Sequence, residues 1–299
     1  MTFSFFSNKK PVFLVYGSKG WIGSLFCEYL TSQHPKITFI QGNSRIDNEQ
    51  HVIFEIKKTK PTHVISFTGR THGTIEGKTI NTIDYLEHPG KLVENVRDNL
   101  VGPIILADVC KKYNIHYTYL GTGCIFNSEM DSDIFTEQSS PNYFGSSYSI
   151  VKGYTDILMK RFSHALNLRI RMPISSKIND RNFITKITKY SKICSIPNSM
   201  TVLDDFFPIF VDLMLKRKSG TYNCTNPGTI SHNEILEAYR EIIDHSFTWV
   251  NMTLEEQNKM LLSARSNNEL CTDKIKNEYP NLKGIKTSVV IALNKMKII

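Results

Sequence analysis

Short apolar runs alternate with stretches of helical spacing along the first part of the chain. Pro11 to Tyr16 is an apolar and aromatic run, which is typical of a strand buried on both faces of a parallel sheet. From Trp21 to Leu30 the apolar residues recur at helical spacing. Further strands are predicted at Ile37 to Ile40 and at His63 to Phe67, with a helical stretch between them. This order predicts right-handed βαβ units in a parallel sheet.

The same rhythm continues beyond the third strand. The pattern predicts a long helix over Leu92 to Tyr113 despite an internal proline, and a strand over His116 to Leu120. A helix is predicted over Tyr148 to Ser163, followed by a strand over Leu168 to Met172.

Beyond this strand the alternation loosens and helices dominate. Two capping-box sequences, Ser231 to Glu234 and Thr253 to Glu256, mark helix starts in this part. We therefore expect an α/β fold with two parts. Residues 1–175 form a doubly wound parallel sheet, and residues 176–299 form a smaller, more irregular lobe, parts of which pack back on the sheet.

A glycine-rich turn joins the first predicted strand to the first helix. It reads Gly17-Ser18-Lys19-Gly20-Trp21-Ile22-Gly23, one residue looser than the usual dinucleotide fingerprint. Glycines allow a tight turn and a close backbone approach, and the helix N-terminus offers N–H groups to a pyrophosphate. The second strand ends in Asn43-Ser44-Arg45, without an early acidic residue. Because a guanidinium suits a ribose 2′-phosphate, the turn predicts a Rossmann domain that binds NADP.

Candidate catalytic groups lie just after the fourth predicted strand and at the start of the helix that follows it. Tyr148 and Lys152 are four residues apart, so they share one helix face, where the ammonium is expected to lower the pKa of the phenol. Thr122 and Cys124 come directly after the strand that ends at Leu120. Ligands of open α/β sheets bind at the carboxyl ends of the strands, so this turn is expected to face the cofactor.

Composition and charge narrow the classes of function. The 299 residues carry a net charge of +8, but the basic residues are scattered, which argues against a nucleic-acid footprint. No apolar run is long enough to span a membrane, and no secretory signal is recognisable at the start. The six cysteines lack zinc-site spacing, so we expect no metal and a cytoplasmic location.

The assembled motifs resemble extended short-chain dehydrogenase/reductases. Downstream sequences bring the chain closer to one subfamily, the bifunctional UDP-4-keto-6-deoxyglucose 3,5-epimerase/4-keto-reductases of UDP-L-rhamnose synthesis. These sequences are Arg171 to Ser176, Arg181 to Ile187, Ile196 to Thr201, Thr225 to Gly228, Ser231 to Leu236 and Arg265 to Leu270. The resemblance extends over nearly the whole chain and includes dTDP-4-dehydrorhamnose reductase as a related enzyme.

The resemblance implies roles for individual residues. Thr122, Tyr148 and Lys152 would serve reduction by NADPH, and Cys124 with Lys186 would serve epimerisation from opposite faces of a nucleotide sugar. Further residues are implied in binding the cofactor, in addition to the glycine turn and Arg45: Phe67, Thr68, Gly69, Asn99 and Pro173. Substrate contacts are implied for Asn182, Lys186 and Arg265. The resemblance also implies a homodimer.

Two alternatives remain open at the level of the sequence. One is a dTDP-4-dehydrorhamnose-type reductase without epimerase activity. The other is an NADP-binding regulatory subunit that has lost catalysis. The sequence does not distinguish a UDP from a dTDP substrate.

Overall fold

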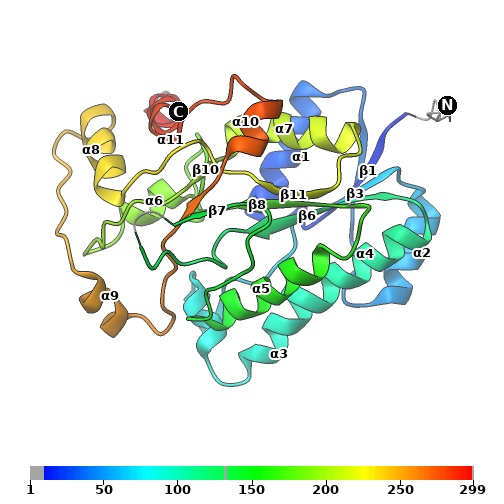
Figure 1. Ribbon diagram of the computed structural model, residues 1–299, viewed down its shortest axis with the longest axis horizontal. Coiled ribbons are helices and arrows are strands. Elements are labelled where there is room, and N and C mark those ends of the chain that lie inside the picture. The colour runs from blue at the N-terminus through cyan, green and yellow to red at the C-terminus, as the bar shows by residue number, and fades with distance from the viewer. Residues whose placement is uncertain (1–9, 131–132, 298–299) are drawn as a thin grey trace.

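A six-stranded parallel sheet forms the centre of the computed structural model, which describes residues 10–130 and 133–297. The strand order is β11-β8-β6-β3-β1-β2, and all five pairings are parallel. Figure 1 shows this sheet nearly edge-on, with helices above and below it. The strands are β1 (Val12–Tyr16), β2 (Thr38–Gln41), β3 (His63–Ser66), β6 (His116–Thr122), β8 (Ala165–Ile170) and β11 (Gly220–Asn223).

Successive side chains of the central strands enter two different cores. Phe13 and Val15 of β1 pack with α1 (Trp21–Gln33) and α7 (Leu203–Leu215), whereas Leu14 and Tyr16 pack with α2 (Glu49–Thr59) and α4 (Gly102–Lys112). A strand covered on both faces needs apolar residues at every position, which explains the continuous run seen in the sequence. The predicted doubly wound α/β fold is therefore confirmed.

The long helix predicted over Leu92 to Tyr113 consists of three consecutive segments. These are α3 (Lys91–Val96), a π-helical turn (Arg97–Val101) and α4, which carries Pro103 in its first turn. Proline has no N–H to donate, and the wider turn before it lets the helix continue.

Two other predicted boundaries were wrong by a few residues. The helix α5 (Ser147–Met159) ends before Ser163, and β8 ends before Met172. Met172 has a positive φ of 40°, which is incompatible with a strand.

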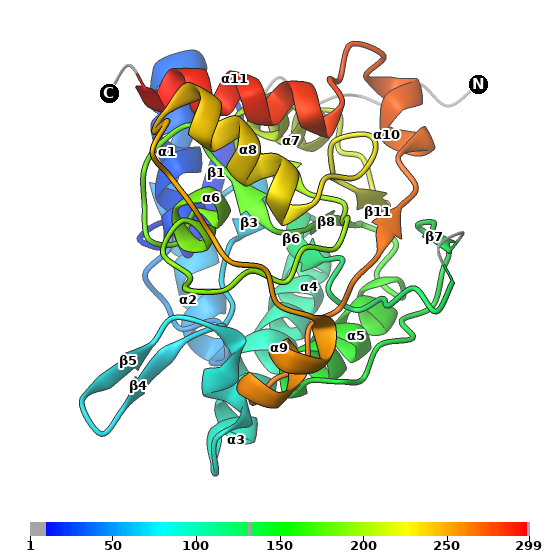
Figure 2. The ribbon, with the colours of Figure 1, turned by 90° about the vertical axis from the view of Figure 1, so that its left-hand side faces the viewer.

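A third core lies in the C-terminal part of the chain. Ile184, Ile235 and Leu293 belong to it, and Figure 2 shows α8 and α11 side by side above α6. Its helices and strands are β9 (Pro173–Ile174), α6 (Phe183–Ile187), β10 (Thr201–Val202), α8 (His232–Ile242) and α11 (Ile285–Lys297). Both predicted capping boxes are present, at the starts of α8 and α9 (Leu254–Met260).

The remaining elements are short. They are the hairpin β4 (Gly73–Ile75) and β5 (Lys78–Ile80), the 3₁₀ turn Ile83–Glu87, the paired strands β7 (Ile134–Phe135) and β12 (Glu269–Leu270), and α10 (Asp273–Glu278). The expected division at residue 175 stays a prediction, and α7 and β11 beyond it do pack on the main sheet. Within the described ranges, no helix is both long and apolar enough to cross a bilayer.

Candidate active site

The glycine turn forms a cradle that side chains would fill. Gly17 has a positive φ of 74°, and a Cβ there would lie 2.9 Å from the carbonyl carbon of Phe67. A Cβ on Gly23 would lie 2.2 Å from the carbonyl oxygen of Gly17. The turn and the loop after β3 therefore approach each other more closely than residues with side chains could.

The N-terminus of α1 offers donors to an anion. Its N-cap residue is Gly20, no side chain of the described residues caps it, and its first turn holds no acidic residue. By contrast, side chains cap α2, α5, α6, α8 and α9. Uncapped N–H groups at a helix start form a site for a phosphate or pyrophosphate, so the cradle fits a dinucleotide.

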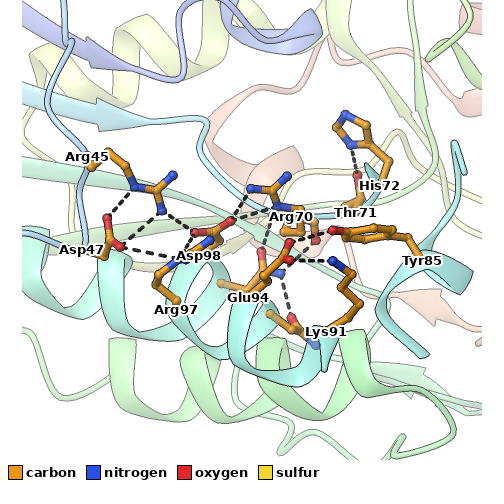
Figure 3. A network of polar contacts seen from close by, with 12 residues as sticks. Arg45, Asp47, Arg70, Thr71, His72, Tyr85, Lys91, Glu94, Arg97 and Asp98 are labelled. Atoms are coloured by element: carbon orange, nitrogen blue, oxygen red, sulfur yellow. Dashed lines mark hydrogen bonds and ion pairs between the residues drawn. The ribbon is translucent and has the colours of Figure 1, made fainter. Parts of the chain in front are cut away.

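Three arginines gather around Asp98, as Figure 3 shows. The guanidinium of Arg45 contacts Asp47 at 2.9 Å and Asp98 at 2.8 Å. Asp98 also pairs with Arg70 at 2.8 Å and Arg97 at 3.0 Å. Three guanidiniums thus share the two carboxylates of Asp47 and Asp98.

The same cluster contains residues that the sequence reasoning missed. Burial would raise the pKa of Asp98, but hydrogen bonds from Arg97, Arg70 and Arg45 lower it below its usual range. Arg70 follows β3 at the carboxyl edge of the sheet, and that position could have indicated it. The backbone N–H groups of Asn43 and Ser44 donate to Glu55 at 2.8 and 3.1 Å, which fixes the loop that presents Arg45.

Asn99 holds the loop after β3 in place. Its Oδ1 accepts from the backbone N–H of Arg70 at 3.0 Å, and its Nδ2 donates to the Arg70 carbonyl at 2.8 Å. Asn99 is almost fully buried on the π-helical turn, and a Cβ on Gly69 would lie 2.9 Å from its Oδ1. The predicted segment Phe67, Thr68 and Gly69 is thereby fixed beside the glycine cradle.

Thr122 and Cys124 lie at the carboxyl end of β6. Thr122 is its last residue, and the Thr122 hydroxyl accepts from the backbone N–H of Cys124 at 3.1 Å. The hydroxyl of Ser149, on α5, donates to the Cys124 carbonyl at 2.7 Å. The main chain of Cys124 is therefore held from both the sheet and α5.

Tyr148 and Lys152 lie on α5, next to the end of β6. Desolvation of the phenol raises the pKa of Tyr148, with a further contribution from Cys124, while a hydrogen bond with Thr122 lowers it. Burial lowers the pKa of Lys152 to about 7, and its ammonium contacts the hydroxyl of Tyr119. The expected lowering of the phenol pKa by the ammonium is thus wrong for this structure. Burial disfavours the charged form of both groups and is the largest cause of both pKa shifts.

Lys186 lies on α6, in the C-terminal lobe. Burial lowers its pKa to about 8, assisted by the positive charges of Arg181 and Arg265. Its ammonium donates to the Asn81 carbonyl at 3.3 Å. The pKa of His72, which lies between β3 and β4, is lowered to about 4. Burial is the largest cause, and the positive charges of Arg181 and Lys186 contribute. Sequence reasoning missed His72.

Asn182 and Arg265 are engaged by neighbouring protein groups. Asn182 is fully buried, and its Nδ2 donates to the carbonyls of Ser175 at 2.7 Å and Lys177 at 2.9 Å while it caps α6. It therefore positions the helix that carries Lys186, and its direct contact with a substrate stays a prediction. Arg265 forms an ion pair with Asp84, which sequence reasoning also missed.

Electrostatic interactions link these groups into one region. Charge interactions with both Arg265 and Cys124 contribute to the pKa of Tyr143. Cys124 also contributes to the pKa values of Tyr148 and Lys152. Pro173, in β9 just beyond the end of β8, is half-buried and pairs with Thr201 of β10. In the described part of the chain, no group of three or more acidic, histidine or cysteine side chains is arranged to hold a metal ion.

Comparisons with known proteins give this site its context. The model of the NAD dependent epimerase/dehydratase family matches residues 13–178. The crystal structure of the L780 UDP-rhamnose synthase from Acanthamoeba polyphaga mimivirus is 51% identical, with a TM-score of 0.92, over 96% of this chain and 100% of that chain. A bifunctional dTDP-4-dehydrorhamnose 3,5-epimerase/dTDP-4-dehydrorhamnose reductase from Arabidopsis thaliana is 43% identical over 93% of this chain and 91% of its own length.

A more distant relative shares the fold. A dTDP-4-dehydrorhamnose reductase from Bacillus anthracis, solved in complex with NADP, is 16% identical, with a TM-score of 0.80 over 97% of this chain and 99% of that chain. The resemblance inferred from the sequence motifs is confirmed by the closer relatives. The chain therefore belongs to the NAD dependent epimerase/dehydratase family.

Proposed function

We propose that this protein epimerises UDP-4-keto-6-deoxy-D-glucose at C3 and C5 and reduces the C4 ketone with NADPH, giving UDP-L-rhamnose. The observation that carries the proposal is that Cys124 lies close to Thr122, Tyr148 and Lys152. Lys186, on α6, is the proposed second member of the epimerising pair. Near full-length similarity to an enzyme named as a UDP-rhamnose synthase supports it. A plain reductase needs neither the thiol nor the second amine.

The cofactor site fits NADPH. The cradle from Gly17 to Gly23 would bind the pyrophosphate, and Arg45 would bind the 2′-phosphate. Lys152 would hold the ribose hydroxyls of the nicotinamide half, near Pro173 and the Phe67–Gly69 loop that Asn99 fixes. When bound, the reduced nicotinamide supplies a hydride to C4.

Epimerisation uses the acidity that the C4 ketone gives to its neighbouring carbons. One member of the pair Cys124 and Lys186 removes a proton from C3 or C5, and the electrons of the broken C–H bond move onto the C4 oxygen. Thr122 and Tyr148 hydrogen-bond that oxygen and stabilise its charge. The other member returns a proton on the opposite face. The pKa of Lys186, at about 8, allows it to gain and lose a proton near neutral pH.

Reduction then requires a proton for the C4 alkoxide. Tyr148 donates it, and the raised pKa of its phenol keeps that proton in place until an alkoxide forms.

The direct test is to incubate the protein with UDP-4-keto-6-deoxyglucose and NADPH in deuterated water and to identify the product by NMR. UDP-L-rhamnose with deuterium at C3 and C5 is expected. A sugar that gains no deuterium, together with NADPH consumption on a ketone that is already epimerised, would show a plain reductase. No NADPH consumption on either ketone would favour a regulatory subunit. Parallel reactions with the dTDP sugar measure nucleotide preference.

Two variants separate the halves of this reaction. Cys124→Ala should abolish deuterium exchange but still reduce a ketone that is already epimerised. Tyr148→Phe should permit exchange but lose NADPH oxidation by about a hundredfold or more. Cys271→Ala serves as the control, because Cys271 is also a partly buried free thiol. Exchange by Cys124→Ala at the wild-type rate would remove the thiol from the mechanism.

We also propose that the protein is a cytoplasmic homodimer. Each of the six cysteines is a free thiol, which suits a reducing compartment. Large apolar side chains are exposed along the neighbouring helices α3 and α5, and Figure 1 shows these helices on the same side of the sheet. The exposed residues there include Leu92, Val93, Tyr154 and Leu158. A second copy that covers this face would remove them from water.

A further inference from the structure

A fully buried arginine follows β8 at the edge of the sheet that carries the candidate catalytic groups. Arg171 is 1% exposed, and its Nη1 lies 3.5 Å from the Sγ of Cys124. We propose that Arg171 is a positioning residue that stabilises negative charge on Cys124, so that the thiolate is the proton-abstracting base of the epimerisation. The assignment to epimerisation rests on the proposed function, whereas the charge interaction does not.

The other contacts of Arg171 are with uncharged groups. Nη1 donates to the hydroxyl of Ser266 at 2.9 Å and to the carbonyl of Gly123 at 3.5 Å. Nη2 donates to Oδ1 of Asn198 and to the Ser266 carbonyl, both at 2.5 Å. Among the described residues, Nε is buried without a partner.

Arg169, two residues earlier, is also fully buried, but a carboxylate balances its charge. Its guanidinium binds both carboxylate oxygens of Asp156, at 2.8 and 2.7 Å. For Arg171, none of the acceptors named above is a carboxylate. Burial lowers the pKa of Arg171, and the groups that favour its charged form are Cys124 and Tyr143. A buried guanidinium is unfavourable without an opposite charge, and a thiolate on Cys124 supplies one.

The geometry keeps the two groups together. The backbone N–H of Arg171 donates to Thr201 at 3.0 Å, and the main chain of Cys124 is held by Thr122 and Ser149. An arginine stays protonated near neutral pH, so it stabilises the thiolate without competing for the substrate proton. In the reaction, the C–H bond breaks, the S–H bond forms, and the electron pair of carbon is left on the enolate.

The test measures thiol reactivity in the free protein. Full-length protein is alkylated with iodoacetamide between pH 5.5 and 9, and modification of Cys124 and Cys271 is quantified separately by peptide mass spectrometry. Cys271 is the internal control, because it is a partly buried free thiol whose pKa burial raises. For Cys124, the rate at pH 7 should lie within about threefold of its rate at pH 9, whereas an ordinary thiol loses about tenfold or more.

Two variants identify the source of this reactivity. Arg171→Met should lower the alkylation of Cys124 at pH 7 by about tenfold, and Arg171→Lys should retain much of it, because the charge remains. A merely structural role would affect both variants alike and leave the shape of the pH profile unchanged. A wild-type profile for Cys124 that parallels that of Cys271, or an unchanged profile in Arg171→Met, would overturn the proposal.

Circular dichroism checks the folding of the variants. If neither variant folds, the wild-type pH profile still tests the proposal, because a profile for Cys124 that parallels that of Cys271 overturns it. Product analysis separates this proposal from the function: a reactive Cys124 in a protein that forms no epimerised sugar would keep the charge pair and reject the epimerase.

Discussion

Lys152 shows most clearly how burial changes a single side chain. Its ammonium contacts the Tyr119 hydroxyl and lies 4.4 Å from the centre of that ring, and burial lowers the pKa of Lys152 to about 7. An unperturbed lysine titrates near 10.4. The unfolded chain therefore binds more protons than the folded protein between about pH 7 and pH 10, so the contribution of Lys152 to stability rises with pH in that range.

Replacing Lys152 should remove this pH dependence. In Lys152→Met, the free energy of unfolding should rise less between pH 6.5 and pH 9 than in the wild type, as measured by urea denaturation of cofactor-free protein. Lys58→Met, at an exposed lysine of α2, is the control and should follow the wild-type curve. Parallel curves for Lys152→Met and the wild type would contradict the assigned pKa.

The arginine cluster in Figure 3 predicts a preference between cofactors. Arg45→Ala should raise the KM for NADPH by about tenfold, the loss of roughly one charge-assisted hydrogen bond, and leave the KM for NADH nearly unchanged. Fluorescence titration with each cofactor measures the same difference without turnover. Lys58→Ala controls for the loss of a surface charge. Equal effects on both cofactors would separate Arg45 from the 2′-phosphate.

At the scale of elements, the start of α1 differs from the starts of α2, α5 and α8, which side chains cap. Its first turn is free of side-chain caps from the described residues, and the turn before it fits closely against the loop after β3. The N-terminus of α1 therefore leaves its first backbone N–H groups available to a ligand, although without a cap this end of the helix is less stable.

A methyl group at Gly23 should damage this element. Gly23→Ala places Cβ 2.2 Å from the carbonyl oxygen of Gly17, so the turn has to move. We expect a loss of about 1–3 kcal/mol in the free energy of unfolding, measured by denaturation, together with weaker NADPH binding. Gly284→Ala, whose Cβ would only reach 3.5 Å from the Pro227 carbonyl oxygen, is the control. Wild-type binding by Gly23→Ala would show that the cradle tolerates movement.

The sequence predicted those parts of the fold that depend on local pattern. The apolar runs at β1, β3 and β6 and the glycine turn each follow from the residues themselves, since a strand covered on both faces has to be apolar throughout. The π-helical turn before Pro103 and the positive φ of Met172 depend on neighbouring packing, so the pattern did not show them.

In the candidate site, too, local pattern predicted some residues and not others. Thr122, Tyr148 and Lys152 could be found because strand ends and helix spacing place them. Arg171 and His72 gain their significance from burial and from partners distant in the sequence, which no local pattern reveals. The pKa of Lys152 could not be predicted for the same reason.

At the scale of the whole molecule, the exposed side of α3 and α5 is the surface to test. Leu158→Glu should convert the proposed dimer into a monomer, measured by light scattering coupled to size-exclusion chromatography, because a charge would be buried in the interface. Val290→Glu is a matched control, since Val290 on α11 and Leu158 are both 42% exposed. A wild-type protein that elutes as a monomer would reject the dimer outright.

The strand β11 has a consequence for dissecting this protein. It pairs with β8, and α7 just before it supplies Phe206, Phe207 and Phe210 to the core shared with β1. A fragment that stops at residue 175 would keep the cofactor cradle and the pairing of β8 with β6, but it would leave the outer edge of β8 unpaired and remove these three aromatic side chains from the core. Such a truncation should precipitate on expression instead of yielding a minimal nucleotide-binding unit.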